Sequence, residues 1–176
     1  MSWFKMSCFN PNFKNKYVKP VKVSSKDCIF DYYDCEDITI KWEDTVSFTV
    51  PIKGGKVIKV YDGDSITIAA KLPFDDAIIY RFSVRLNGID TPEIKGKTDD
   101  EKEAAKHARD ALSELILNKN ITLKNVNNEK YGRILADVYL DDLHVNEWLI
   151  KERFAVRYYG GTKTTPESWL QYKNII

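Results

Sequence analysis

Carboxylates at two places in this chain are spaced so that they could bind a cation. Asp62 and Asp64 flank a glycine, and Asp90 and Glu93 flank a Thr-Pro pair farther along. Carboxylate oxygens alone are the ligands of hard cations, so calcium or magnesium is favoured. An EF-hand is excluded because Ile66 stands where that loop needs a third oxygen ligand. The simpler alternative is that these acids only form turns, as Asp-Gly pairs often do.

Basic residues near these acids could bind phosphate. Arg85 precedes Asp90 by five residues, and Lys130 and Arg133 share a short loop-like stretch with Tyr131 and Gly132. A guanidinium is a planar fork that matches phosphate oxygens at two points, and phosphoryl transfer places added charge on those oxygens. The alternative for any single arginine is a solvated surface residue.

Zinc chemistry is disfavoured. His107 and His144 show no ligand spacing, and the three cysteines (Cys8, Cys28 and Cys35) lie near the N-terminus. An odd number of cysteines fits a reducing compartment better than a disulfide framework.

Alternating patterns predict the strands that must position these residues. Phe82, Val84 and Leu86 alternate with polar residues, so Arg85 projects from the face opposite the apolar one. Pro92 cannot donate to a sheet ladder, so this strand must end before it. Five strands are expected to form the barrel: Lys56–Val60, Ser65–Leu72, Ile79–Ile89, Ile121–Val126 and Ile134–Leu140.

Three helices complete the predicted fold. Thr98 to Glu101 has capping-box spacing, and the apolar residues behind it recur every three or four positions, which predicts a helix of about 18 residues. A second helix is expected from Val145 to about Arg153. A third, short one is expected to start at Thr165-Pro166-Glu167. The order predicts an α+β, mainly β class: a five-stranded OB-fold barrel with about three helices packed around it.

The first 45 residues differ in composition and are predicted to be an N-terminal extension, with one domain over 46–176. Residues 1–26 contain six lysines and no acid, whereas residues 27–45 contain seven acids and one lysine. A basic arm rich in aromatic residues could contact nucleic acid, a membrane surface or a partner protein; the alternative is that it packs against the domain. Ile38–Trp42 and Val46–Val50 alternate like strands.

Charge and hydropathy restrict the function classes. Residues 46–176 contain 20 basic and 19 acidic residues, so attraction for a polyanion must come from a local cluster or from the arm. No apolar run reaches the length of a membrane span. The N-terminus lacks the pattern of a secretory signal, so an intracellular location is expected. We assume a monomer.

Three motifs in order resemble the staphylococcal nuclease (thermonuclease) family. They are Val60-Tyr61-Asp62-Gly63-Asp64-Ser65, Arg85 to Glu93, and Lys130-Tyr131-Gly132-Arg133, and the resemblance covers roughly residues 50–172. It implies an OB-fold enzyme that cleaves DNA and RNA with one calcium ion, endonucleolytically, and leaves 3′-phosphate ends.

The resemblance also implies roles for individual residues. Asp64, Asp90 and the backbone carbonyl of Thr91 would bind calcium, with Asp62 standing behind them. Glu93 would be the general base, and Arg85 and Arg133 would hold the scissile phosphate. Substrate contacts would come from Lys130, Tyr158 and Tyr159, although the spacing of this tyrosine pair is compressed relative to the family pattern.

The alternative function is a non-catalytic OB-fold module that binds nucleic acid or protein, since a fold alone does not give an activity. Inactive copies are expected to lack one or more of five charged residues. All five are present here: Asp64, Arg85, Asp90, Glu93 and Arg133.

Overall fold

The computed structural model describes residues 41–163 and 165–174. By its internal contacts the chain divides into two units, Met1–Phe48 and Thr49–Ile176. In the first unit the described part is a short 3-10 helix, η1 (Trp42–Asp44). The basic arm, the cysteines and the acidic stretch up to residue 40 lie outside the described residues.

Of the two strand predictions near the unit boundary, that of Val46–Val50 is wrong, whereas that of Ile38–Trp42 falls mainly on residues outside the described ranges. Trp42 begins η1 instead of ending a strand, and the rest of Ile38–Trp42 lies almost wholly outside the described residues. Val46–Val50 forms no strand, and the side chains of Val46 and Phe48 are exposed. Alternation alone did not suffice here because a strand also needs a neighbour to satisfy its backbone groups.

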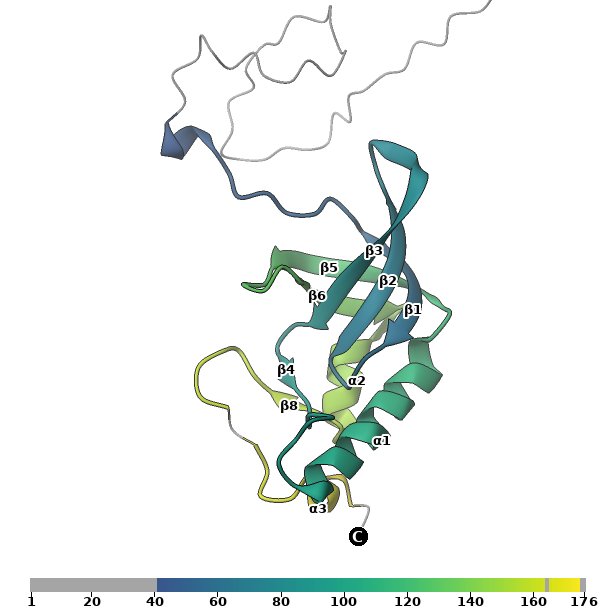
Figure 1. Cartoon of the computed structure of the whole chain (residues 1–176), viewed down its shortest axis with the longest axis vertical. Coiled ribbons are helices and arrows are strands. Elements are labelled where there is room, and N and C mark those ends of the chain that lie inside the picture. The colour runs from purple at the N-terminus through teal and green to yellow at the C-terminus, as the bar shows by residue number, and fades with distance from the viewer. Residues whose placement is uncertain (1–40, 164, 175–176) are drawn as a thin grey trace, which may run out of the picture. The chain divides into compact units, whose positions relative to one another are not determined.

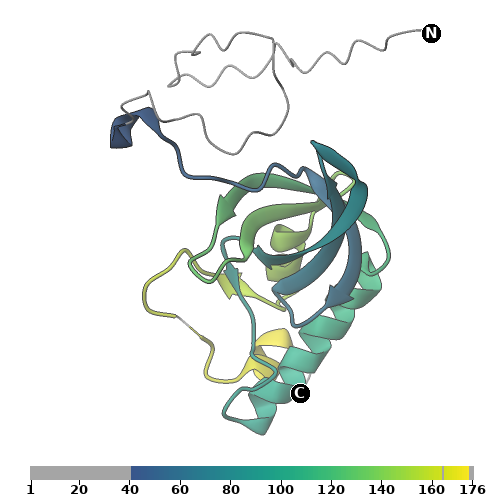
Figure 2. The same ribbon diagram turned by 45° about the horizontal axis from the view of Figure 1, so that its top comes forward.

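The second unit is built on a closed five-stranded barrel, which confirms the predicted fold class (Figures 1 and 2). Neighbouring strands are antiparallel in the order β3-β2-β1-β5-β6. Parallel pairing of β3 with β6, from Val84↔Ile134 to Leu86↔Ala136, closes the barrel. The strands are β1 (Gly54–Val60), β2 (Ser65–Leu72), β3 (Asp75–Leu86), β5 (Asn120–Asn128) and β6 (Ile134–Leu140).

The barrel interior is filled by every second residue of its strands, as the alternation predicts. Examples are the buried pair Ile66 and Ile68 of β2, and the buried pair Val84 and Leu86 of β3. Arg85 lies between the two buried residues of β3, so its side chain leaves the barrel on the outer face. The alternation therefore fixes where Arg85 can act.

Two helices pack on the barrel. Helix α1 (Asp99–Ile116) starts at Thr98, whose side chain accepts a hydrogen bond from the Glu101 backbone N–H, as predicted. Helix α2 (Val145–Lys151) lies at one end of the barrel and buries Val145 and Leu149 in its core (Figure 2). Buried Asn146 ties α2 down, since it accepts from the Val138 N–H at 2.9 Å and donates to the Asn87 carbonyl at 2.8 Å.

The third helix begins later than predicted. Helix α3 runs over Trp169–Lys173, and its cap is Ser168 instead of Thr165. Asp100 at the start of α1 explains the shift, because its carboxylate accepts from the Ser168 hydroxyl at 2.9 Å and from the Trp169 N–H at 3.0 Å. A contact between distant segments thus sets this helix start, and local sequence does not reveal it.

A small second sheet links the exit of β3 to the C-terminal segment. β3 ends at Leu86, three residues earlier than predicted, because Gly88 takes a positive φ of 73° in a turn. Strand β4 (Ile89–Asp90) then pairs with β8 (Val156–Arg157). A side chain at Gly88 would meet the Tyr159 ring at 3.1 Å. This sheet brings the residues after β8 beside Asp90.

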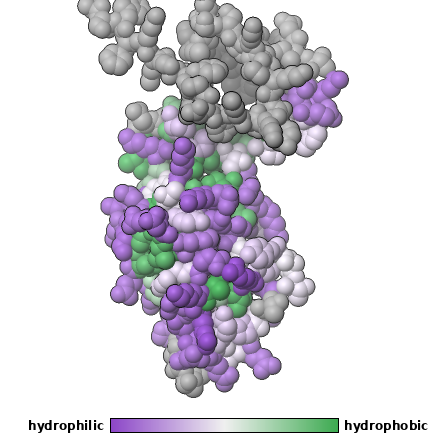
Figure 3. All heavy atoms as spheres, turned by 180° about the vertical axis from the view of Figure 1, so that it is seen from behind, coloured by the Kyte–Doolittle hydropathy of each residue, from purple (hydrophilic) through white to green (hydrophobic). Residues whose placement is uncertain are grey.

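The short strand β7 (Leu143–His144) pairs with the end of β6 and leads directly into α2. No helix in the described ranges is long and apolar enough to cross a membrane. The face seen from behind in Figure 3 is mainly hydrophilic, with small separate hydrophobic patches.

Candidate active site

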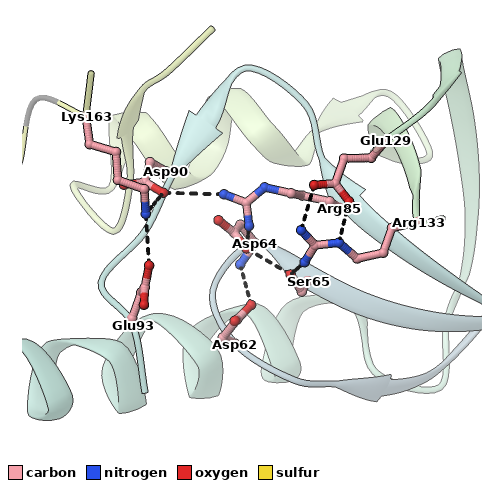
Figure 4. A network of polar contacts seen from close by, with 9 residues as sticks. All are labelled: Asp62, Asp64, Ser65, Arg85, Asp90, Glu93, Glu129, Arg133 and Lys163. Atoms are coloured by element: carbon pink, nitrogen blue, oxygen red, sulfur yellow. Dashed lines mark hydrogen bonds and ion pairs between the residues drawn. The ribbon is translucent and has the colours of Figure 1, made fainter. Parts of the chain in front are cut away.

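Two buried carboxylates share one guanidinium at the end of β3 (Figure 4). Arg85 Nη1 lies 2.8 Å from Asp64 Oδ1, and its Nη2 lies 3.3 Å from Asp90 Oδ1. The side chains of Asp64 and Asp90 are only 4% and 3% exposed. Asp64 comes from the turn before β2, and Asp90 from β4, so three separate segments meet here.

Strand register explains why Asp64 and Arg85 meet. Ser65, the first residue of β2, pairs with Arg85 across the β2–β3 ladder, so the preceding Asp64 is brought next to the same arginine. Gly63 lets the turn lie close to α1 and β4, since a Cβ there would be 3.0 Å from both Ala108 and Thr91. The Asp64 N–H donates to Asp62 Oδ1 at 3.3 Å, which holds the turn.

This arrangement is short of positive charge. Burial raises the pKa of Asp64 to about 7, although Arg85 opposes the shift, and the nearby Asp62 raises it further. A carboxyl group with that pKa gains most from an additional cation, because the cation offsets the desolvation of its charged form. A cation placed beside Asp64 would therefore favour the charged form of its carboxyl group.

The donors available here suit a hard cation. They are carboxylate oxygens and the backbone of the buried Thr91, and none of the described residues that line this site carries sulfur or imidazole. In the described part of the chain, no three acidic, histidine or cysteine side chains are already grouped to hold a metal. Arg85 and a lysine occupy the carboxylate oxygens instead, so an ion would have to share or displace these partners.

That lysine is Lys163, from the segment after β8. Its Nζ lies 3.1 Å from Asp90 Oδ1 and 2.9 Å from Glu93 Oε1 (Figure 4). The hydrogen bond and charge of Lys163 lower the pKa of Glu93. Glu93 is the most exposed acid of the group, at 61% of its side chain. It therefore stands ionised at neutral pH and faces solvent.

A second arginine lies across the site on the loop between β5 and β6. Arg133 donates two hydrogen bonds to Glu129, from Nε to Oε2 at 2.8 Å and from Nη2 to Oε1 at 3.0 Å. These contacts raise the pKa of Arg133. The remaining terminal nitrogen of Arg133, Nη1, donates to the Ser65 hydroxyl at 3.4 Å. Ser65 in turn donates to Asp64 Oδ1 at 2.9 Å, so its hydroxyl links Arg133 to Asp64.

A hollow of about 270 Å³ opens over these groups. It is lined by residues from three distant stretches of sequence, including Asp62, Asp64, Arg85, Asp90, Thr91, Glu93 and Arg133. An adjoining hollow of about 260 Å³ shares Arg85 and is lined by Gly88, Tyr158 and Tyr159, among others. Carboxylates that can hold a cation, two arginines and an ionised glutamate facing one hollow are suited to phosphate ester chemistry.

Comparison with known proteins identifies the family. The sequence model described as staphylococcal nuclease homologue matches residues 83–174, just over half of the chain. The chain belongs to the staphylococcal nuclease family. This confirms the resemblance drawn from the three motifs, the first of which lies outside the matched range.

Several proteins similar to this chain are named as nucleases. A protein of Escherichia coli named uncharacterized endonuclease is 31% identical over 98 residues, 55% of this chain and 56% of that protein. Another of the same name, from Haemophilus influenzae, is 32% identical over 103 residues, 58% of this chain and 51% of that protein. A probable staphylococcal-like nuclease of Oryza sativa subsp. japonica is 27% identical over 84 residues, 48% of this chain and 24% of that protein. The chain spans about half the length of the first relatives.

The structure gathers most of the site residues predicted from sequence. Seven line the central hollow and the two tyrosines line its neighbour. Lys130 is apart from them, with its Nζ 4.8 Å from the centre of the Tyr131 ring. Membership of a nuclease family and this grouping together support a hydrolase that acts on phosphodiester bonds.

Three contributors were missed from the sequence. Glu129 precedes Arg133 by four residues, so its ion pair could have been considered from the spacing. Ser65 stands within a quoted motif, but its link to Arg133 depends on the fold. Lys163 offers no signal in the sequence, because it meets Asp90 and Glu93 only through the β4–β8 pairing.

Proposed function

We propose that this chain is a calcium-dependent nuclease that hydrolyses DNA or RNA endonucleolytically and leaves 3′-phosphate ends. One observation carries the proposal: five charged residues from distant stretches line a single hollow. They are Asp64, Arg85, Asp90, Glu93 and Arg133. The names of the relatives in this family support the same activity.

The arginines would bind the scissile phosphate. A guanidinium has five N–H donors, and Arg85 uses one on Asp64 and one on Asp90, so donors remain for phosphate oxygens. Arg133 adds a second positive charge from the other side of the hollow. Donors fixed in this way stabilise charge as it develops on the phosphate, and one such donor is typically worth about 2.7–4 kcal/mol.

Glu93 would accept the proton of the attacking water. The water oxygen bonds to phosphorus, the bond to the 5′-oxygen breaks with its electron pair, and that oxygen takes a proton from solvent. The contact with Lys163 lowers the pKa of Glu93, which keeps this carboxylate ionised and makes it a weaker base.

Asp64, Asp90 and the Thr91 carbonyl would hold the calcium ion, with Asp62 supporting the Asp64 turn. When bound, calcium supplies positive charge beside the phosphate and orients water. The raised pKa of Asp64 supports this assignment, because it indicates a buried carboxylate that lacks sufficient positive charge.

Substrate assays with defined ends test the proposal. Purified protein is incubated with single DNA and RNA strands, in calcium or in excess chelator, and the 3′ ends are probed for polymerase extension before and after phosphatase treatment. We expect internal cleavage in calcium only, with ends that a polymerase extends only after phosphatase. Full activity in chelator would refute the calcium role, and ends extended directly would refute the product assignment.

A matched pair of variants assigns the base. Glu93→Ala should lower turnover at least roughly a hundredfold, because a positioned base contributes about 10²–10⁴-fold. Glu114→Ala, which removes an exposed glutamate on α1, should leave turnover unchanged. If wild-type protein binds the strands and never cleaves them, the chain is the non-catalytic module instead.

We also propose that residues 46–176 form the catalytic domain as a monomer, and that residues 1–45 act in binding or location. The basic, aromatic composition of residues 1–26 supports this division. Deleting residues 1–45 should preserve cleavage while changing affinity for long nucleic acids or for anionic vesicles. Loss of cleavage in the folded, truncated protein would count against the division.

A further inference from the structure

Three tyrosines stand exposed in the described part of the chain, and each has a cation beside it. Lys59 Nζ lies 5.9 Å from the centre of the Tyr61 ring, and Lys130 Nζ lies 4.8 Å from that of Tyr131. Arg157 Nη1 donates to the Tyr159 hydroxyl at 3.3 Å. The exposed fractions are 54%, 73% and 77% for Tyr61, Tyr131 and Tyr159. Exposed rings paired with cations are typical of surfaces that stack unpaired bases and attract their phosphates.

Tyr61 lies on the side of the central hollow that the proposed function leaves unused. A third hollow, of about 290 Å³, shares Tyr61, Asp62 and Arg133 with the central one. The hollow of Tyr158 and Tyr159 shares Arg85 with the central one. The two outer hollows have no lining residue in common, so the central hollow stands between them.

Strand register gives this third hollow its floor. Lys59 of β1 pairs with Thr67 of β2, and Thr67 pairs with Ser83 of β3, so the three form one row across the sheet. The row lies two residues along the strands from the pair Ser65 and Arg85, a step of about 7 Å on the same face. All three side chains of the row line the hollow.

The chemistry of the lining suits one nucleotide of a strand. In the lining, Lys59 and Arg133 bring two positive charges against the single carboxylate of Asp62. Glu129, which is not part of the lining, pairs with Arg133. Hydroxyl groups of Ser65, Thr67 and Ser83 can donate to or accept from sugar and phosphate oxygens. The ring of Tyr61 provides the apolar surface on which a base can stack.

We propose that the hollow of Lys59, Tyr61, Thr67 and Ser83 binds an unpaired nucleotide of the substrate. This nucleotide is joined to the scissile phosphate on the side away from the nucleotide at Tyr158 and Tyr159. The proposal rests on the proposed function. If the subsite exists, an efficient substrate needs at least one nucleotide on each side of the cleaved bond. This requirement would account for cleavage at internal positions of a strand.

Two substrates separate this subsite from the catalytic centre. One is a nucleoside 5′-(p-nitrophenyl phosphate), which has a nucleoside on one side only, and the other is a fluorescent tetrathymidylate. Tyr61→Ala should raise KM for the tetranucleotide at least about fivefold more than KM for the ester, because it removes one stacking platform. Lys59→Ala should act in the same direction, and Tyr61→Trp should restore the wild-type ratio.

Phe74→Ala and Lys71→Ala form the matched control, since both residues are exposed near the turn between β2 and β3 and line none of these hollows. The subsite would be refuted if Tyr61→Ala changed KM equally for both substrates. It would also be refuted if the ratio of the two KM values were the same in Tyr61→Ala as in the control variants. If wild-type protein hydrolyses neither substrate, the proposed function fails by itself. The subsite is then decided by fluorescence anisotropy: fivefold weaker tetrathymidylate binding in Tyr61→Ala supports it, and unchanged binding refutes it.

Discussion

The two sides of the site are built differently. On the barrel side, Asp64 and Arg85 are fixed by paired strands, and the carboxylates there are almost fully buried. On the loop side, Glu93 and Lys163 lie between or beyond regular elements and are largely exposed. Buried charges that lose a partner are costly, whereas exposed ion pairs contribute little and exchange easily. The barrel side is therefore a fixed frame, and the loop side is where partners can be replaced.

Removing the guanidinium of the barrel side should have a large effect, comparable to that of removing the proposed base Glu93. Arg85→Ala should lower turnover about 10²- to 10³-fold, because a fixed donor to the phosphate is lost. Arg81→Ala is the control, since Arg81 is an exposed arginine on the same strand. Steady-state cleavage of a defined oligonucleotide measures both. A near-wild-type rate for Arg85→Ala in folded protein would contradict the proposed difference between the barrel side and the loop side.

The buried Asp64 should make stability depend on pH. Its pKa is about 7 in the folded chain, against about 3.9 in an unfolded one. Between these values the folded chain holds a proton that the unfolded chain has released. The free energy of unfolding without metal should then fall as pH rises, by at most about 1.4 kcal/mol per pH unit.

Asp64→Asn removes this titration, so the variant should gain stability relative to wild type from pH 4 to pH 7 and no further above it. Denaturant melts in chelator across that range provide the measurement. Asp142→Asn, which changes an exposed acid in a turn, should follow wild type. Parallel curves for Asp64→Asn and wild type would show that burial of Asp64 does not have this consequence.

The smallest effect is expected for Lys163 of the loop side. Under the proposed calcium role, Lys163→Met should strengthen calcium binding by up to about fivefold, because the ion no longer competes with an ammonium group held by a partly exposed ion pair. Isothermal titration calorimetry measures the affinity without any substrate. Lys106→Met on the exposed face of α1 is the control. Weaker binding by Lys163→Met would mean that Lys163 supports the ion.

The local sequence pattern predicted the barrel strands and the start of α1 well, for a physical reason. The buried alternation of Ile66 with Ile68 and of Val84 with Leu86 is a direct result of strand geometry, and the cap at Thr98 needs only residues three apart. The same alternation failed at Val46–Val50, because pairing with another strand cannot be read from one segment.

Most of the contacts that escaped prediction join distant segments. Asp100 sets the start of α3, and Lys163 reaches Asp90 and Glu93 from about 70 residues away in sequence. Glu129 could have been inferred from its spacing to Arg133, but its grip depends on the turn through Gly132, where φ is 81°. The acidic and basic side chains were foreseen from the motifs, whereas the partners that set their protonation were not.

The segment that bears Lys163 is held at both ends, by the β4–β8 pairing before it and by the contact of Asp100 with Ser168 after it. The effective concentration of its ammonium group at Asp90 and Glu93 is therefore set by the length of this segment. For short tethers this concentration is of millimolar order, and it does not depend on the concentration of the protein in solution. Because the contact is partly exposed, dissolved monovalent salt still screens it. Under the proposed calcium role, the ion would have to displace this tethered ammonium group, which would raise the free calcium level needed to fill the site.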